Sequence, residues 1–133
     1  MQTRDQRFAS AIYKHVMKVK DESFATSYGS MAHKLPVLIH TSGLAQALAF
    51  VDSRRDEQGP ACLLEDLAQA VIGKPAKDFL EQAREGDLRK YMYLTEQTLA
   101  ALLWYKRYAQ SLLDVEADQD DTQSKQGGRN GGE

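Results

Sequence analysis

The chain has 133 residues, of which 42% are hydrophobic, and a formal net charge of −2. This size fits one domain with a core of its own, and the single cysteine, Cys62, excludes an intramolecular disulfide or a multi-cysteine metal site. No apolar run approaches the roughly 20 residues that a membrane span needs, and the charged start lacks a signal-peptide region. We therefore expect a cytoplasmic protein with no membrane partner.

The charge is unevenly distributed along the chain. Residues 1–55 hold 8 Lys and Arg against 4 Asp and Glu, whereas residues 116–133 hold 2 against 5. Acidic residues are absent from 23–51 and from 97–113. Segments that face a polyanion avoid acids, but buried segments avoid them too, and burial is the commoner cause. A slightly acidic chain therefore does not exclude a nucleic-acid partner for its first half.

The first predicted helix spans residues 4–20 and carries a basic row. Thr3 is its expected N-cap, and apolar residues at spacings of three and four form one face: Phe8, Ile12, Val16 and Val19. Away from that face, Arg7, Lys14 and Lys18 fall within a sector of about 40° that contains no acid. Such a row can follow several phosphates of a nucleic acid. It can equally be an ordinary solvated helix face, and the sequence alone leaves both interpretations open.

Helical periodicity continues through the middle of the chain, and no strand alternation is found. Four shorter helices are expected, over residues 26–40, 44–53, 61–72 and 76–85. Pro36 lies inside the first of them and predicts a kink or a break, because proline lacks a backbone donor. Residues 52–60, dense in charge and ending in Gly-Pro, are expected to form an exposed loop.

The last predicted helix, residues 88–113, is the longest and is capped by Asp87. Its apolar residues form two nearly opposite stripes, one of which includes Leu88 and is interrupted by Lys106. The other carries three aromatic side chains that are typical interface anchors: Tyr93, Trp104 and Tyr108. A helix that is apolar on two sides is either central to the fold or shared with a partner.

The predicted fold is thus an all-α, single-domain bundle of about six helices over residues 1–115. Residues 116–133 contain no apolar stripe, and we expect them to form a flexible polar tail.

Residues typical of catalysis are not arranged in a recognisable set. The histidines at 15, 33 and 40 lack the spacing of a helical metal pair, and they are expected to be surface or hydrogen-bonded side chains. Cys62 lies near a helix start, which favours an activated thiol, but a lone cysteine is more often an inert apolar residue. We expect no enzyme activity, no metal and no cofactor.

Two segments together resemble the small-subunit family of the type III-B (Cmr-type) CRISPR effector complexes. The first is Tyr-Gly-Ser-Met-Ala-His-Lys-Leu-Pro-Val-Leu-Ile at 28–39, followed by Gly-Leu at 43–44 and Leu-Ala-Phe at 48–50. The second is Tyr-Met-Tyr-Leu-Thr at 91–95, followed by Trp-x-Lys-Arg-x-Ala at 104–109. With the first helix, the resemblance covers about residues 4–113, and the tail has no counterpart.

The resemblance implies a non-catalytic helical subunit of an antiviral ribonucleoprotein. Its partners would be other effector subunits, copies of itself and the backbone of guide and target RNA, whose sequence is read by base pairing. Candidate RNA-backbone contacts are the basic residues of the acid-free segments, namely Arg7, Lys14, Lys18, Lys34, Lys106 and Arg107. Two alternatives stay open, a protein-interaction adaptor without nucleic-acid contact and a small helical DNA-binding regulator.

Overall fold

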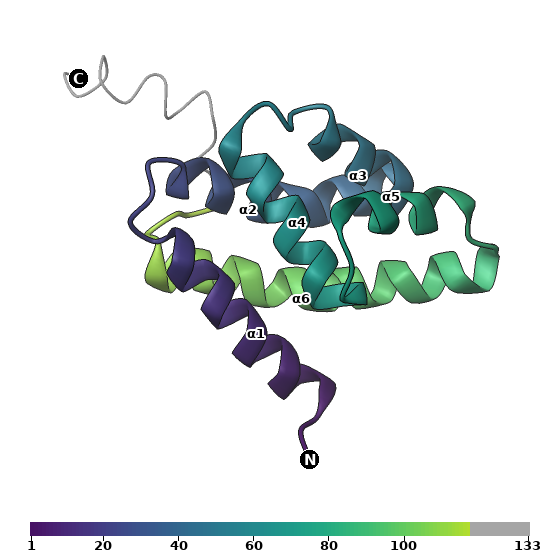
Figure 1. The fold of residues 1–133 in the computed structure, drawn as a ribbon, viewed down its shortest axis with the longest axis horizontal. Helices are drawn as coiled ribbons and strands as arrows, with labels where there is room; N and C mark the ends of the chain where they lie inside the picture. Colours follow the sequence, from purple (N-terminus) through teal and green to yellow (C-terminus); the bar gives the residue numbers. More distant parts are fainter. Residues whose placement is uncertain (118–133) are drawn as a thin grey trace.

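A computed structural model describes residues 1–117, which form a bundle of six α-helices with no strand in that part of the chain (Figure 1). The helices are α1 (Arg4–Val19), α2 (Ala25–Ser42), α3 (Leu44–Asp52), α4 (Gln58–Ile72), α5 (Ala76–Glu85) and α6 (Leu88–Leu112). The predicted all-α class, with one long C-terminal helix, is confirmed. The predicted tail lies outside the described residues, except for Glu116 and Ala117.

Short polar signals set the helix boundaries. The Thr3 side chain accepts a hydrogen bond from the Gln6 backbone, and the Gln6 side chain accepts one from the Thr3 backbone, which makes a capping box at α1. Asp87 accepts from the backbone nitrogen of Lys90 at 2.9 Å and caps α6 as predicted. Gly43, with φ of +89°, separates α2 from α3, in a conformation that favours glycine.

The structure differs from the sequence expectation near two prolines. Helix α2 continues through Pro36 to Ser42, so of the kink or break expected at Pro36, no break occurs. Its flanking residues Leu35 and Ile39 are buried, and packing on both sides of the proline keeps the helix in place. Helix α4 begins at Gln58, so Gly59 and Pro60 are buried helical residues rather than part of an exposed loop. Pro60 is tolerated because the first-turn N–H groups have no intrahelical partner.

The core is organised around α6, which lies along one side of the bundle and is crossed by α1 near its C-terminal half (Figure 1). Its fully buried residues share one face: Leu94, Thr98, Ala101, Leu102, Tyr105 and Ala109. The sequence analysis placed Tyr105 on neither of the two apolar stripes of this helix. Leu88, which it placed on one of the stripes, is 73% exposed. Periodicity gives the direction in which a side chain points, but it does not reveal which flank of a two-sided helix is covered by its neighbours.

Candidate nucleic-acid interface

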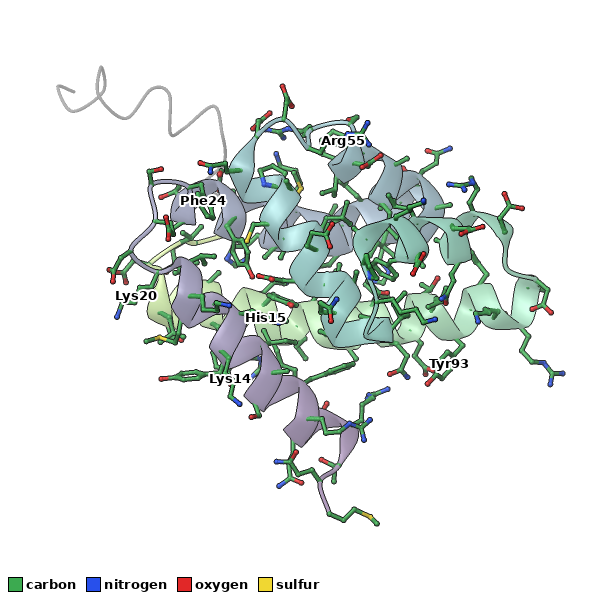
Figure 2. The ribbon with its side chains drawn as sticks, in the orientation of Figure 1. Lys14, His15, Lys20, Phe24, Arg55 and Tyr93 are labelled. Atoms are coloured by element: carbon green, nitrogen blue, oxygen red, sulfur yellow. The ribbon has the colours of Figure 1, made fainter. Side chains whose placement is uncertain are left out.

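The basic row predicted on α1 lies on the solvent side of that helix. Arg7, Lys14 and Lys18 are exposed, and the buried residues of α1 lie on its other side. Figure 2 shows Lys14 on the outer side of α1, and His15 on the side that faces the bundle. All three basic residues line one surface hollow of about 490 Å³, together with Gln2, Ser10, Ala11 and His15. The structure therefore brings these three cations together around one depression.

The other three basic candidates do not join this row. Lys34 is half-buried on α2, and Lys106 is half-buried on α6. On α6, Tyr108 contacts α1, since its hydroxyl donates to the Ala9 carbonyl at 3.1 Å. At 100° per residue, Lys106 lies about 160° around the helix from Tyr108, on the flank away from α1. Arg107 is exposed on the outer side of α6. The stripe on α1 is thus the one concentrated basic surface among the six candidates.

The three aromatic interface candidates have different surroundings. Tyr108 packs edge-on against Tyr13 at a ring-centroid distance of 5.6 Å, and Trp104 lies 5.7 Å from Tyr108. Both Trp104 and Tyr108 are half-buried and pack against the core. Tyr108 also attaches α1 to α6 through its contacts with Tyr13 and Ala9. Tyr93, by contrast, is 60% exposed.

Tyr93 lines an open groove of about 650 Å³ between the ends of α4, α5 and α6. One part of the groove is apolar, formed by Val71, Ile72 and Leu94, and the rest carries the polar and charged side chains of Gln82, Asp87, Arg89 and Lys90. Leu88 and Met92 are 73% and 62% exposed, but they lie about 140° and 100° around the helix from Tyr93 and do not line the groove. An exposed aromatic side chain beside a partly apolar groove is typical of a protein contact surface.

A polar cluster that the sequence did not reveal holds α1 to the bundle. His15 Nδ1 lies 2.8 Å from the hydroxyl of Tyr105, and their rings stack. The hydroxyl of Tyr28, whose ring packs against Tyr105, donates to Asp66 Oδ2 at 2.6 Å. These side chains come from four helices and are separated by up to 90 residues, so no local sequence pattern predicts the cluster. It fixes the position of the helix that carries the basic row.

Burial controls the ionisation of this cluster. It raises the pKa of the Asp66 carboxyl above its usual value, although the hydrogen bond from Tyr28 and the nearby His15 oppose the shift. Burial, aided by the neighbouring Asp66, also raises the pKa of the Cys62 thiol to about 11. At neutral pH Cys62 is therefore a protonated thiol, which favours the inert interpretation over an activated nucleophile.

We predict that stability falls as the pH rises through the titration of Asp66. The folded chain holds the Asp66 proton more tightly than the unfolded chain does, so the protonated carboxyl stabilises the fold below the unfolded pKa of about 3.9. That contribution is lost as the pH passes the raised folded pKa. Urea unfolding of the wild type and Asp66→Asn should show the wild type losing stability relative to the variant over this window. A relative gain would contradict the prediction.

Other site types receive no support within residues 1–117. No group of three or more His, Cys, Asp and Glu side chains there is arranged to hold a metal ion. No helix among these residues is both long and apolar enough to cross a membrane. Helix α3, considered as a DNA-reading helix, exposes Gln46, Ala49 and Phe50, which include only one side chain suited to base edges.

Comparison with known proteins agrees with the resemblance predicted from the sequence. A family model described as CRISPR-associated protein (Cas_Cmr5) matches residues 4–112. The chain is 44% identical over 114 residues to the CRISPR system Cmr subunit Cmr5 of Thermus thermophilus, covering 86% of this chain and 99% of the relative. The crystal structure of a CRISPR-associated Cmr5 family protein from the same organism superposes with a TM-score of 0.80 at 42% identity, covering 85% of this chain and 99% of that one. The chain belongs to the Cmr5 family of CRISPR-associated proteins.

Proposed function

We propose that the chain is a non-catalytic structural subunit of a type III-B CRISPR ribonucleoprotein in the cytoplasm. In this role it packs against other effector subunits and copies of itself, and it contacts the backbone of the guide–target RNA during antiviral defence. Family membership supports the assignment to the complex. The observation that carries the RNA contact is the acid-free row of Arg7, Lys14 and Lys18 around one surface hollow.

The basic row suits contacts with phosphates better than contacts with bases. Three cations spread over 12 residues of helix span about 16 Å, which covers several phosphates along one strand. Contacts of this kind are independent of sequence and weaken with salt. The remaining candidates are secondary because they lie apart from the row; they are Lys34, Lys106 and Arg107. An RNA strand could contact them together with the row only by passing over several faces of the subunit.

We predict that changing Arg7, Lys14 and Lys18 together to Ala weakens target retention by the assembled complex. Three exposed ionic contacts of up to about 1 kcal/mol each correspond to a loss of up to roughly 100-fold. The loss should be similar for unrelated target sequences, and the slope of log affinity against log salt should become shallower by about two to three. Filter binding with two targets across a salt series measures both effects.

A matched control is offered by Lys74, Lys77 and Arg84, which are exposed on or beside α5. Changing these three to Ala alters the net charge equally but leaves the α1 row intact, so retention and salt slope should stay near the wild type. If the complex keeps its target retention and its salt slope after the three α1 changes, the RNA contact assigned to α1 is wrong and the adaptor alternative is favoured.

We also predict that Tyr93→Ala weakens assembly with sister subunits without unfolding the chain. Tyr93 is 60% exposed beside the groove between α4, α5 and α6, so its removal creates no cavity. Truncating an interface anchor costs about 2 kcal/mol, or roughly 30-fold in affinity. Co-purification together with circular dichroism tests this expectation. If the Tyr93→Ala variant assembles normally, the interface lies elsewhere.

The double variant Trp104→Ala, Tyr108→Ala should also weaken assembly. Its stability should be lower as well, because both side chains also pack within the chain.

A further inference from the structure

His15 lies on α1 between the face that packs on the bundle and the basic row. It precedes Lys18 by three positions, so their Cβ atoms are about 5–6 Å apart on the helix surface. The ring is half-buried and lines the same hollow as the row (Figure 2). Ala11, one helical turn before it, lines the hollow as well and has only a methyl side chain. A group that Lys18 holds in this hollow can therefore also reach the His15 ring.

The buried hydroxyl of Tyr105 determines which nitrogen of this ring carries the proton. Burial raises the pKa of the Tyr105 hydroxyl well above its usual value, so the hydroxyl keeps its proton. Its only hydrogen-bond partner within residues 1–117 is His15 Nδ1, at 2.8 Å. A buried donor left without an acceptor is costly, so the hydroxyl donates to Nδ1. The neutral ring then carries its own proton on Nε2.

The second ring nitrogen, Nε2, is accessible to solvent and has no partner in the described part of the chain. The buried side-chain atoms without a partner within residues 1–117 are His33 Nδ1 and Thr98 Oγ1, and His15 Nε2 is not among them. Asp66 lies close enough to affect His15 electrostatically, but its carboxyl accepts from the Tyr28 hydroxyl at 2.6 Å and not from the ring. His15 therefore presents a free N–H donor at the edge of the basic hollow.

We propose that His15 donates a hydrogen bond from Nε2 to a phosphate oxygen of the RNA backbone that the basic row holds in this hollow. The inference rests on the RNA contact proposed above and adds a neutral donor to its three cations. Flexible lysine side chains attract a phosphate as point charges, whereas the His15 ring is held in place by Tyr105, which also stacks on it. His15 thus fixes where along α1 the backbone sits, and it connects the RNA contact to the core of the bundle.

The position of the proton can be measured on the wild-type chain. Long-range proton–nitrogen correlation spectra at pH 8, where histidine side chains are ordinarily neutral, should show Nε2 of His15 protonated and Nδ1 unprotonated. Adding a short single-stranded oligouridine should shift the ring signals of His15 and leave those of His40, which is exposed at the end of α2, unchanged. A proton on Nδ1, or a His15 ring that does not respond while amide signals around Lys14 do, would overturn the proposal.

Two substitutions separate the roles of the two ring nitrogens. The oxygen of Asn is two bonds from Cβ, as Nδ1 is, so His15→Asn still accepts from Tyr105 but its N–H group ends one bond short of Nε2. The N–H group of Gln is three bonds from Cβ, as Nε2 is, so His15→Gln keeps the donor. Oligouridine affinity should fall by about 5- to 10-fold in His15→Asn and stay within about 2-fold of the wild type in His15→Gln. His40→Asn, a matched control, should bind like the wild type. Equal losses in the Asn and Gln variants would contradict the assigned donor.

The salt dependence separates a failure of this inference from a failure of the proposed function. A neutral donor releases no counterion, so His15→Asn should keep the wild-type slope of log affinity against log salt, whereas the triple Ala variant of the basic row should make it shallower. If the triple variant loses affinity and His15→Asn does not, the RNA contact stands and the role of His15 is wrong. If neither variant loses affinity, the RNA contact fails and the role of His15 fails with it. A shallower slope in His15→Asn would show a charged contact and contradict the neutral donor.

Discussion

Tyr105→Ala is expected to lower the free energy of unfolding by about 3–5 kcal/mol, the range for truncating a large buried aromatic residue. Tyr105 is fully buried at the place where α1, α2 and α6 meet. Its removal leaves a cavity and takes away the hydroxyl that bonds His15 Nδ1. A domain of this size has a total stability of about 5–15 kcal/mol, so we expect Tm to fall by roughly 10–25 °C. Thermal and urea unfolding followed by circular dichroism measure this.

Two companion variants separate the causes of this loss. Tyr105→Phe keeps the ring but removes the bond to His15, and should cost about 1 kcal/mol. Tyr93→Ala removes the same side chain from an exposed position of the same helix, and should change stability by about 0.5 kcal/mol or less. Equal effects of Tyr105→Ala and Tyr93→Ala would show that Tyr105 does not hold the bundle together.

The helices of this chain could be predicted from the sequence because their signals are local. Spacings of three and four residues identified all six, and the caps at Thr3 and Asp87 lie where polar side chains precede apolar runs. The errors occurred where tertiary packing overrides a local rule. Pro36 is held inside α2 by burial on both sides, and Gly59 and Pro60 were assigned to a loop because nothing local reveals that α2 packs against them.

The candidate site was predictable only in part, for the same physical reason. The row of Arg7, Lys14 and Lys18 lies on one helix, so its geometry follows from the period of 3.6 residues. Lys34 and Lys106 come from other helices, and their position relative to that row depends on how the helices pack. The cluster of His15, Tyr28, Asp66 and Tyr105 is entirely a product of packing. Tyr105 in particular lies between two sequence stripes, and its burial is decided by the neighbours that α1 and α2 provide.

Gly59→Ala is expected to destabilise the chain by about 1–3 kcal/mol, although alanine is the better helix former by about 1 kcal/mol. Gly59 lies in the first turn of α4, and an added Cβ would overlap Ser27 Oγ and lie 2.8 Å from the backbone nitrogen of Tyr28. Ser27 can rotate away, but a backbone atom can move only if α2 and α4 separate, which also strains the bond between Tyr28 and Asp66. Urea unfolding should show the loss, whereas Gln58→Ala, exposed in the same turn, should change stability by less than about 0.5 kcal/mol. A stabilised Gly59→Ala variant would mean that helix propensity outweighs the close approach of α2 and α4.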